Sequence, residues 1–345
     1  MRIAHVHFYV EDAKSRDWFV SRLGFQSVAV KVSSFHTCTE VVKSGSVCFV
    51  LSSPLTPLSP VAQFLQQHPP GVADIAFYVE DVEAVMTRAI AYGAKVLQPV
   101  QQHQRGKELL KWGRIAAWGS LSHTLIEEQG VPSGELGATA PHNFTGIDHV
   151  VLNVADGDLE RAANWYENTL GFHSRQTFKI QTDHSALQSQ VMVSHNNQVQ
   201  LPINQPASPN SQIQEFLDVN QGPGIQHIAL QTPNIVQAIR RFRQTGVSFL
   251  PVFPSYYTQL LQRQGLSLSV AELEEIAEQQ ILVDWEETTP QSVLLQTFTQ
   301  PIFGQPTFFF ELIERRRQAR GFGEGNFRAL FEAIECEQLK RGSLQ

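Results

Sequence analysis

The sequence contains two copies of one long pattern, and this duplication restricts the possible fold more than any other feature. Residues 5–25 read HVHFYVEDAKSRDWFVSRLGF, and residues 149–172 read HVVLNVADGDLERAANWYENTLGF. A second pair follows in the same order, with GVADIAFYVEDVEAVMTRAIAYGAKVL at 71–97 and GIQHIALQTPNIVQAIRRFRQTGVSFL at 224–250. Two independent matches in the same order indicate that a whole half of the protein is duplicated, and that each half holds two related units.

Each unit begins with an apolar strand, passes through a polar turn and enters an amphipathic helix that ends at glycine. Further β-type runs follow the helices, such as those at 47–51 and 191–193. We therefore predict an α+β protein with four βαβββ units. Two units per half would curl into an open β-barrel, which gives two barrel domains with helices outside.

The segment 132–143 is rich in glycine, proline and small polar residues and lies between the two halves. Such a composition is typical of a linker. It predicts a domain over 1–131, a linker over 132–143 and a second domain over 144–345. We also predict a loop over 202–211, which carries three prolines, and a short helix over 270–280 before the last strands.

The composition excludes several classes of partner. Hydrophobic residues make up 42% and charged residues 17% of the 345 residues, which is enough for two buried cores. A net charge of −7 offers no basic surface for nucleic acid or an anionic membrane. No stretch is apolar for long enough to span a bilayer, and we see no signal peptide. Three cysteines do not form a disulfide framework, so we expect a reducing, cytoplasmic setting.

Three polar residues interrupt apolar strands in the second half, namely His149, His227 and Glu311. Burying a carboxylate costs several kcal/mol unless the group is paired or bound to a cation. Two imidazoles and one carboxylate form the facial ligand set that leaves three positions open on ferrous iron. The repeat puts the two histidines at closely similar places in successive units, so symmetry predicts that they meet on one barrel wall.

Each of these residues alone would more simply be a buried histidine or an exposed glutamate, and it is their combination that favours a metal site. The first half provides an internal comparison. His5 stands at the position of His149, but Asp74 replaces His227 and Thr124 falls where Glu311 should be. We therefore predict that the first barrel has no metal and the second binds one ion.

Four such units with ligands on equivalent strands resemble the vicinal oxygen chelate superfamily, which has the glyoxalase-like fold. The sequence is more closely similar to the 4-hydroxyphenylpyruvate dioxygenase family. The segments that carry this resemblance are GIDHVV (146–151), LPIN (201–204), SQIQ (211–214), LLQTFT (294–299), PTFFFELIER (306–315) and GFGEGNF (321–327).

The resemblance implies a role for each matching residue. One Fe2+ per chain would be held by His149, His227 and Glu311, which form the catalytic centre. A helix over 321–335 would close the pocket, and two aromatic side chains would flank the substrate ring. The implied substrate-binding residues have polar or aromatic side chains: Ser189, Asn204, Gln214, Gln226, Gln296, Phe298, Phe322, Asn326 and Phe327.

The resemblance also implies an activity. 4-Hydroxyphenylpyruvate and O2 would be converted to homogentisate and CO2 by oxidative decarboxylation, ring hydroxylation and side-chain migration. The product would serve tyrosine catabolism or quinone and tocopherol synthesis. The expected partners are these two small molecules, with no nucleic acid and no membrane, and the expected assembly is a homo-oligomer, either a dimer or a tetramer.

Three other functions fit the same fold. A 4-hydroxymandelate synthase would use the same iron and substrate but hydroxylate the benzylic carbon, so its product would distinguish it. A non-catalytic ligand-binding protein would consume no O2 when given iron and substrate. A zinc or nickel isomerase commonly uses more metal ligands than the three visible here.

Overall fold

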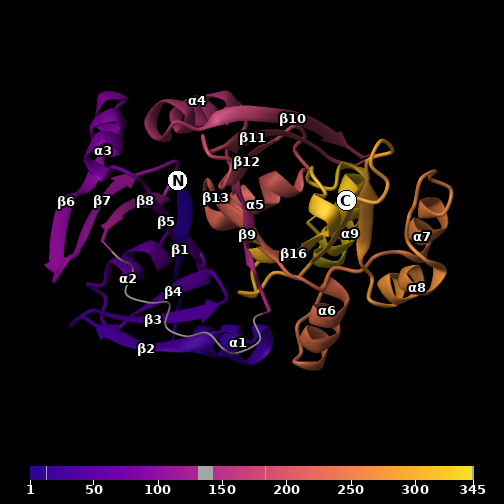
Figure 1. The fold of residues 1–345 in the computed structure, drawn as a ribbon, viewed down its shortest axis with the longest axis horizontal. Coiled ribbons are helices and arrows are strands. Elements are labelled where there is room, and N and C mark those ends of the chain that lie inside the picture. Colours follow the sequence, from indigo (N-terminus) through magenta and orange to yellow (C-terminus); the bar gives the residue numbers. More distant parts are fainter. Residues whose placement is uncertain (13, 131–142, 183, 344–345) are drawn as a thin grey trace.

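The computed structural model describes residues 1–345 except 13, 131–142, 183 and 344–345. Two curled eight-stranded sheets carry their helices on the outside, one sheet for each half of the chain (Figure 1). The predicted linker over 132–143 lies outside the described residues except for Asn143. The predicted domain boundaries therefore stay a prediction.

The first sheet has the strand order β2-β3-β4-β1-β5-β8-β7-β6, with β1 and β5 paired at its centre. Each of its two units contributes one strand to this central pair and three more strands to one side of the sheet. The elements are β1 (Arg2–Tyr9), α1 (Lys14–Leu23), β2 (Gln26–Ser33), β3 (Thr37–Ser44), β4 (Val47–Pro54), α2 (Pro60–Leu65), β5 (Gly71–Tyr78), α3 (Val82–Ala91), β6 (Val96–Arg105), β7 (Glu108–Ala116) and β8 (Ser122–Gln129).

The second sheet repeats this topology in the order β10-β11-β12-β9-β13-β16-β15-β14, so the prediction of four βαβββ units is confirmed. Its fourth unit contains two extra helices before the last strands. The elements are β9 (Gly146–Asn153), α4 (Leu159–Leu170), β10 (His173–Gln181), β11 (Ala186–Val193), β12 (Gln200–Pro206), α5 (Gln212–Asn220), β13 (Gly224–Gln231), α6 (Ile235–Gln244), α7 (Pro254–Leu260), α8 (Val270–Glu278), β14 (Leu282–Trp285), β15 (Val293–Phe298), β16 (Phe309–Arg315) and α9 (Phe327–Arg341).

Helix α4 shows how the repeated pattern forms its helix. Ala162, Ala163, Tyr166 and Leu170 are buried and recur at the three- and four-residue spacing of one helix face. The helix ends at Gly171, whose φ of +72° lies in the left-handed region that glycine adopts without strain. The glycine seen in the sequence pattern therefore marks the end of the helix.

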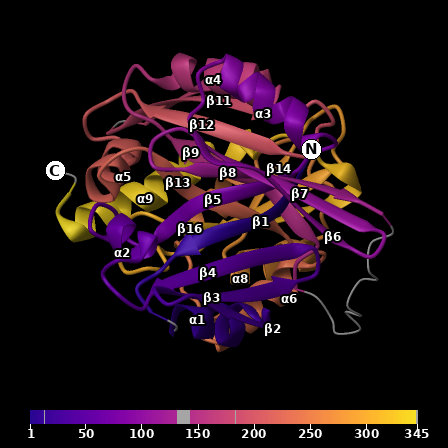
Figure 2. The ribbon, with the colours of Figure 1, turned by 90° about the vertical axis from the view of Figure 1, so that its left-hand side faces the viewer.

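Aromatic residues join the two halves into one core. Helices α3 and α4 lie side by side across the boundary between the halves (Figure 2), where Arg88 Nε donates to the Thr169 carbonyl at 3.0 Å. Deeper in, the ring centroids of Phe8 and Phe308 lie 5.1 Å apart, and those of Phe49 and Phe310 lie 5.7 Å apart. One cluster of buried apolar residues therefore extends from the first sheet into the second.

Two predicted segments need correction. The loop over 202–211 is wrong in its first part, because β12 continues to Pro206. Pro202 is tolerated there because the pairing of β12 with β9 begins at Ile203, so its missing N–H breaks no bond to that strand. The closing helix begins at Phe327 and extends to Arg341, beyond the predicted end at 335.

The other expectations on helices can be checked directly. The helix predicted over 270–280 is present as α8, and Ser269 and Glu272 form a capping box at its start. None of the helices in the described part of the chain is long and apolar enough to cross a membrane.

Candidate metal centre and substrate cavity

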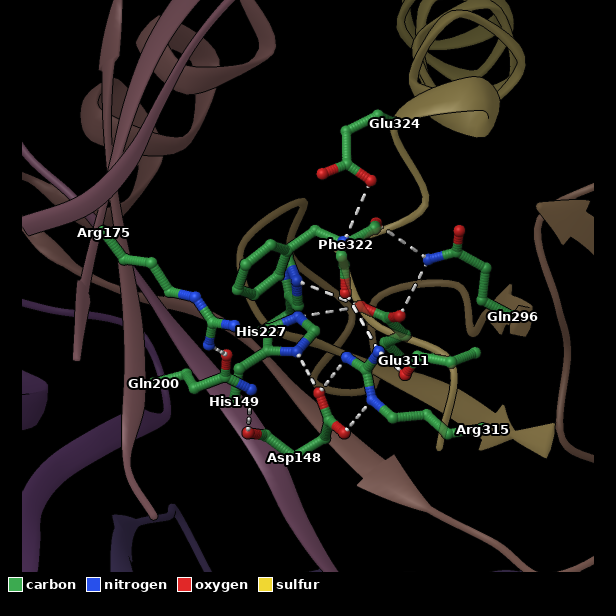
Figure 3. A network of polar contacts seen from close by, with 12 residues as sticks. Asp148, His149, Arg175, Gln200, His227, Gln296, Glu311, Arg315, Phe322 and Glu324 are labelled. Carbon is green, nitrogen blue, oxygen red and sulfur yellow. Dashed lines mark hydrogen bonds and ion pairs between the residues drawn. The ribbon is translucent and has the colours of Figure 1, made fainter. Parts of the chain in front are cut away.

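His149, His227 and Glu311 converge inside the second sheet, with one ligand atom from each within 4.8 Å of the other two. Glu311 Oε2 lies 3.1 Å from His149 Nε2 and 3.5 Å from His227 Nε2 (Figure 3). Among the residues the structure describes, no other set of three histidine, cysteine or acidic side chains comes this close.

The strand register brings these three side chains together. Ala229 of β13 lies opposite His149 of β9 on one side and Glu311 of β16 on the other. His227 precedes Ala229 by two residues and therefore points to the same face of the sheet. The alternation in β16 likewise sends Glu311 into the barrel and Phe310 out of it, toward the first half of the protein.

The three side chains strongly affect each other's charge. Burial alone would raise the pKa of Glu311, but the two imidazoles lower it to about 2. Burial alone would lower the pKa of His149, but the carboxylates of Glu311 and Asp148 raise it to about 9. Burial lowers the pKa of His227, and Glu311 only partly opposes this effect. Without a metal ion, the carboxylate is therefore stabilised by an imidazolium at His149.

The donor set fits a divalent metal ion. An octahedral ion bound at about 2.1 Å from each ligand separates neighbouring ligand atoms by about 3 Å, which is close to the two distances from Glu311. Glu311 is only 2% exposed and needs a cationic partner. The ring of His227 stacks on Phe309 at 4.8 Å, and its Nδ1 has no hydrogen-bond partner among the described residues.

Two residues that the sequence analysis did not select hold His149 in place. Asp148 Oδ1 lies 2.9 Å from His149 Nδ1, so the opposite nitrogen faces Glu311. Arg315 donates two hydrogen bonds to the same carboxylate, of 2.6 and 2.7 Å. Outer contacts of this kind fix the orientation of a ligating imidazole. The signal in the sequence was Asp148 itself, a carboxylate directly before a candidate ligand.

The raised pKa of His149 predicts how metal binding depends on pH. Its Nε2 must lose a proton to bind a metal, and the proton is held up to about pH 9 in the metal-free protein. The dissociation constant for Mn2+ should therefore fall by about tenfold per pH unit between pH 6 and pH 9, and then level off. Equilibrium dialysis across this pH range measures the dissociation constant. A dissociation constant that does not change above pH 7 would contradict the prediction.

A cavity extends from the triad between the sheet and helix α9. It is lined by eight of the nine predicted substrate-binding residues, Ser189, Asn204, Gln226, Gln296, Phe298, Phe322, Asn326 and Phe327. Apolar side chains make up most of the remaining wall, including Ile180, Leu187 and Phe331. The cavity therefore combines aromatic walls with a few amide and hydroxyl groups, a composition typical of small-molecule sites.

Gln214 is the exception, because it does not line the cavity. Its amide donates to Asp218 at 2.8 Å on the outer side of α5. Gln212 lines the cavity instead, although it was not among the predicted residues. Ser211 caps a helix that begins at Gln212, so residues 212 and 214 lie roughly 200° apart around the helix axis and point to nearly opposite sides.

This difference between the two glutamines can be tested. Gln212→Ala should raise KM for the substrate by about 10-fold, because a hydrogen-bonding side chain is lost from the cavity wall. Gln214→Ala provides the matched control and should leave KM within about twofold, since its side chain lies outside the cavity. Steady-state kinetics on both variants measure these KM values. If Gln214→Ala raised KM more than Gln212→Ala, Gln214 would belong to the substrate site.

The first sheet preserves the geometry of the site with other side chains. Ala76 lies opposite His5 and Thr124, as Ala229 lies opposite His149 and Glu311. Asp74 occupies the place of His227, and its carboxylate accepts a 2.6 Å hydrogen bond from Ser122 Oγ. The register thus agrees with the equivalences proposed from the repeat. That the first barrel binds no metal stays a prediction.

Comparisons with known proteins agree with this architecture. A family model described as "Hydroxyphenylpyruvate dioxygenase, HPPD, N-terminal" matches residues 2–122. A model of the "Glyoxalase/Bleomycin resistance protein/Dioxygenase superfamily" matches residues 146–264. Among solved structures, a variant of 4-hydroxymandelate synthase from Streptomyces coelicolor is similar, with a TM-score of 0.86, 29% identity and 98% of each chain covered.

Curated relatives match over nearly the whole chain. The 4-hydroxyphenylpyruvate dioxygenase of Coccidioides posadasii is 39% identical, over 99% of this chain and 94% of that protein. The 4-hydroxyphenylpyruvate dioxygenase of Dictyostelium discoideum is 36% identical, over 99% of both. With its duplicated barrel, its buried triad and this full-length similarity, the chain belongs to the 4-hydroxyphenylpyruvate dioxygenase family.

Proposed function

We propose that this protein is an Fe2+-dependent enzyme that converts 4-hydroxyphenylpyruvate and O2 to homogentisate and CO2. The observation that carries the proposal is the His149, His227 and Glu311 triad at the base of an aromatic-walled cavity. One ferrous ion bound by these ligands would supply the redox chemistry that activates O2 for oxidative decarboxylation and ring hydroxylation.

The chain's own residues would orient the substrate and keep the site dry. Phe298 and Phe327 would hold the aromatic ring, and the surrounding apolar wall would exclude water. The polar groups lining the cavity would hydrogen-bond the substrate oxygens. We propose Ser189, Asn204, Gln212, Gln226, Gln296 and Asn326 for this role, with Phe322 at the wall beside His149.

Gln296 links the metal site to the cavity wall. Its Nε2 donates to Glu311 Oε1 at 3.0 Å, which orients the carboxylate and leaves Oε2 facing the two imidazoles. Its Oε1 accepts from Asn326 Nδ2 at 2.8 Å. We propose that Gln296 therefore orients Glu311, in addition to its place in the cavity wall.

Four wider proposals accompany this function. The two sheets would correspond to a metal-free domain over 1–131 and a catalytic domain over 144–345. Each chain would bind one ion, and the chains would form a homo-oligomer, a dimer or a tetramer. The free thiols of Cys38, Cys48 and Cys336 support a reducing, cytoplasmic setting.

Oxygen uptake with product identification tests the function. The protein is loaded anaerobically with Fe2+, mixed with 4-hydroxyphenylpyruvate and exposed to O2, with metal-free protein as the control. We expect one O2 consumed for each homogentisate and CO2 formed. If mass spectrometry and NMR instead identify 4-hydroxymandelate, the activity of the solved structural relative applies. If no O2 is consumed, the protein is a ligand-binding member of the fold.

A further inference from the structure

Arg315, the last residue of β16, contacts two parts of the protein that are far apart in the sequence. Its Nε and Nη2 donate to the two oxygens of Asp148, at 2.6 and 2.7 Å. Its Nη1 donates to the backbone carbonyls of Ala319 and Gly321, both at 3.0 Å. The guanidinium is thus bonded to the start of β9 and to the segment that leads into α9 (Figure 3).

The first contact leads to the metal ligand. Asp148 is held by Arg315 on both oxygens, and one of these oxygens also faces His149 Nδ1 at 2.9 Å. The side chains of Asp148 and Arg315 are 6% and 13% exposed, so solvent screens their interaction little. The direction of His149 Nε2 therefore depends on where Arg315 fixes this carboxylate.

The second contact leads to the cavity wall. The segment 319–323, which we call the strap, carries Phe322, whose ring packs against the ring of His149 at 5.3 Å. Gln296, which bonds Glu311, also approaches the Phe322 carbonyl at 3.4 Å. The strap therefore contacts His149 directly and contacts Gln296, the neighbour of Glu311.

Gly323 shows how tightly the strap is seated. A side chain there would collide with the amide of Gln296, and the residue has a φ of +76°. Only glycine combines this close approach with a left-handed backbone at no steric cost. The strap is thus fitted against the ligand-orienting groups and cannot shift without disturbing them.

We infer that Arg315 is a positioning residue that couples metal binding at His149 to the seating of the strap and of helix α9 over the cavity. The inference rests on the proposed metal site. A guanidinium suits this task because its planar fork binds both carboxylate oxygens and still has donors for two carbonyls. A lysine ammonium has one nitrogen and cannot span all four acceptors.

The test measures metal affinity and hydrogen exchange, with neither substrate nor O2. Mn2+ is used as a redox-stable probe, and exchange is followed for the strap, for residues 324–326 and for the first turn of α9, with and without saturating Mn2+. Useful reporters are the amides of Phe322, Gly325 and Asn326, which donate to Glu324, Asp284 and Gly323. In the unmodified protein, we expect Mn2+ to slow exchange of these amides.

In Arg315→Gln we expect the dissociation constant for Mn2+ to rise about 10- to 100-fold. The slowing of exchange should then be lost even at saturating Mn2+. Arg315→Lys should not restore it. Arg316→Gln is the matched control, because Arg316 pairs with Glu314 and Glu272, away from His149. The control should behave as the unmodified protein in both measurements.

Three results would overturn the inference. The first is that Mn2+ leaves exchange of the strap unchanged in the unmodified protein. The second is that Arg315→Gln keeps the metal-dependent slowing, and the third is that Arg316→Gln loses this slowing to the same extent. If Arg315→Gln does not fold, Arg315→Lys and the unmodified protein still give these readings. Failure of the proposed reaction would appear separately, as absent homogentisate from an enzyme that binds metal normally.

Discussion

We expect Glu311→Gln to abolish turnover and to weaken metal binding by more than about 10²-fold, the upper end of the loss known for outer-contact changes. Glutamine keeps the shape of the side chain but removes the negative charge that faces both imidazoles at 3.1 and 3.5 Å. Glu311 is only 2% exposed, so little water can reach the site to stabilise a bound cation in place of the lost carboxylate charge. Oxygen uptake measures the loss of turnover. Anaerobic dialysis against Fe2+ measures the loss of metal affinity.

The matched control for this change is Glu278→Gln. Glu278 pairs with Arg240 at 3.6 Å, and its side chain is 66% exposed. It should retain turnover and metal affinity within about twofold, because exposed ion pairs contribute little. Full activity with one Fe2+ per chain in Glu311→Gln would remove this residue from the ligand set and with it the proposed chemistry.

The second large effect is on stability. Phe310 is fully buried and packs on Phe49, Phe19 and Phe308, so it ties the second sheet to the first half of the protein. Phe310→Ala should lower the free energy of unfolding by about 3–5 kcal/mol, from lost burial and the cavity left behind. Denaturant titration at fixed metal concentration measures this loss.

Phe35→Ala is the control for Phe310→Ala. Phe35 is 94% exposed, so its removal should change the free energy of unfolding by no more than about 0.5 kcal/mol. Phe310 points away from the metal centre, so its loss should leave Mn2+ affinity per folded molecule unchanged. A variant as stable as the original would show that the aromatic contact between the halves contributes nothing to stability.

The sequence alone predicted the four βαβββ units and the three side chains that converge in the candidate metal centre. The units follow from hydrophobic periodicity, which is local and visible in any stretch of chain. The meeting of His149 with His227 was predicted from the repeat, because equivalent positions in equivalent strands face the same way. A carboxylate such as Glu311 inside an apolar strand then has few physical explanations other than a cation.

Only the tertiary structure decided which neighbours surround these ligands. The choice between Gln212 and Gln214 depends on the phase of a helix whose start is set by Ser211. The contact of Asp148 with Arg315 joins residues 167 positions apart, through the register of β9 and β16 on either side of β13. Side-chain direction within one strand follows from a period of two, but contacts between distant elements depend on how those elements pack, and no local pattern in the sequence records that.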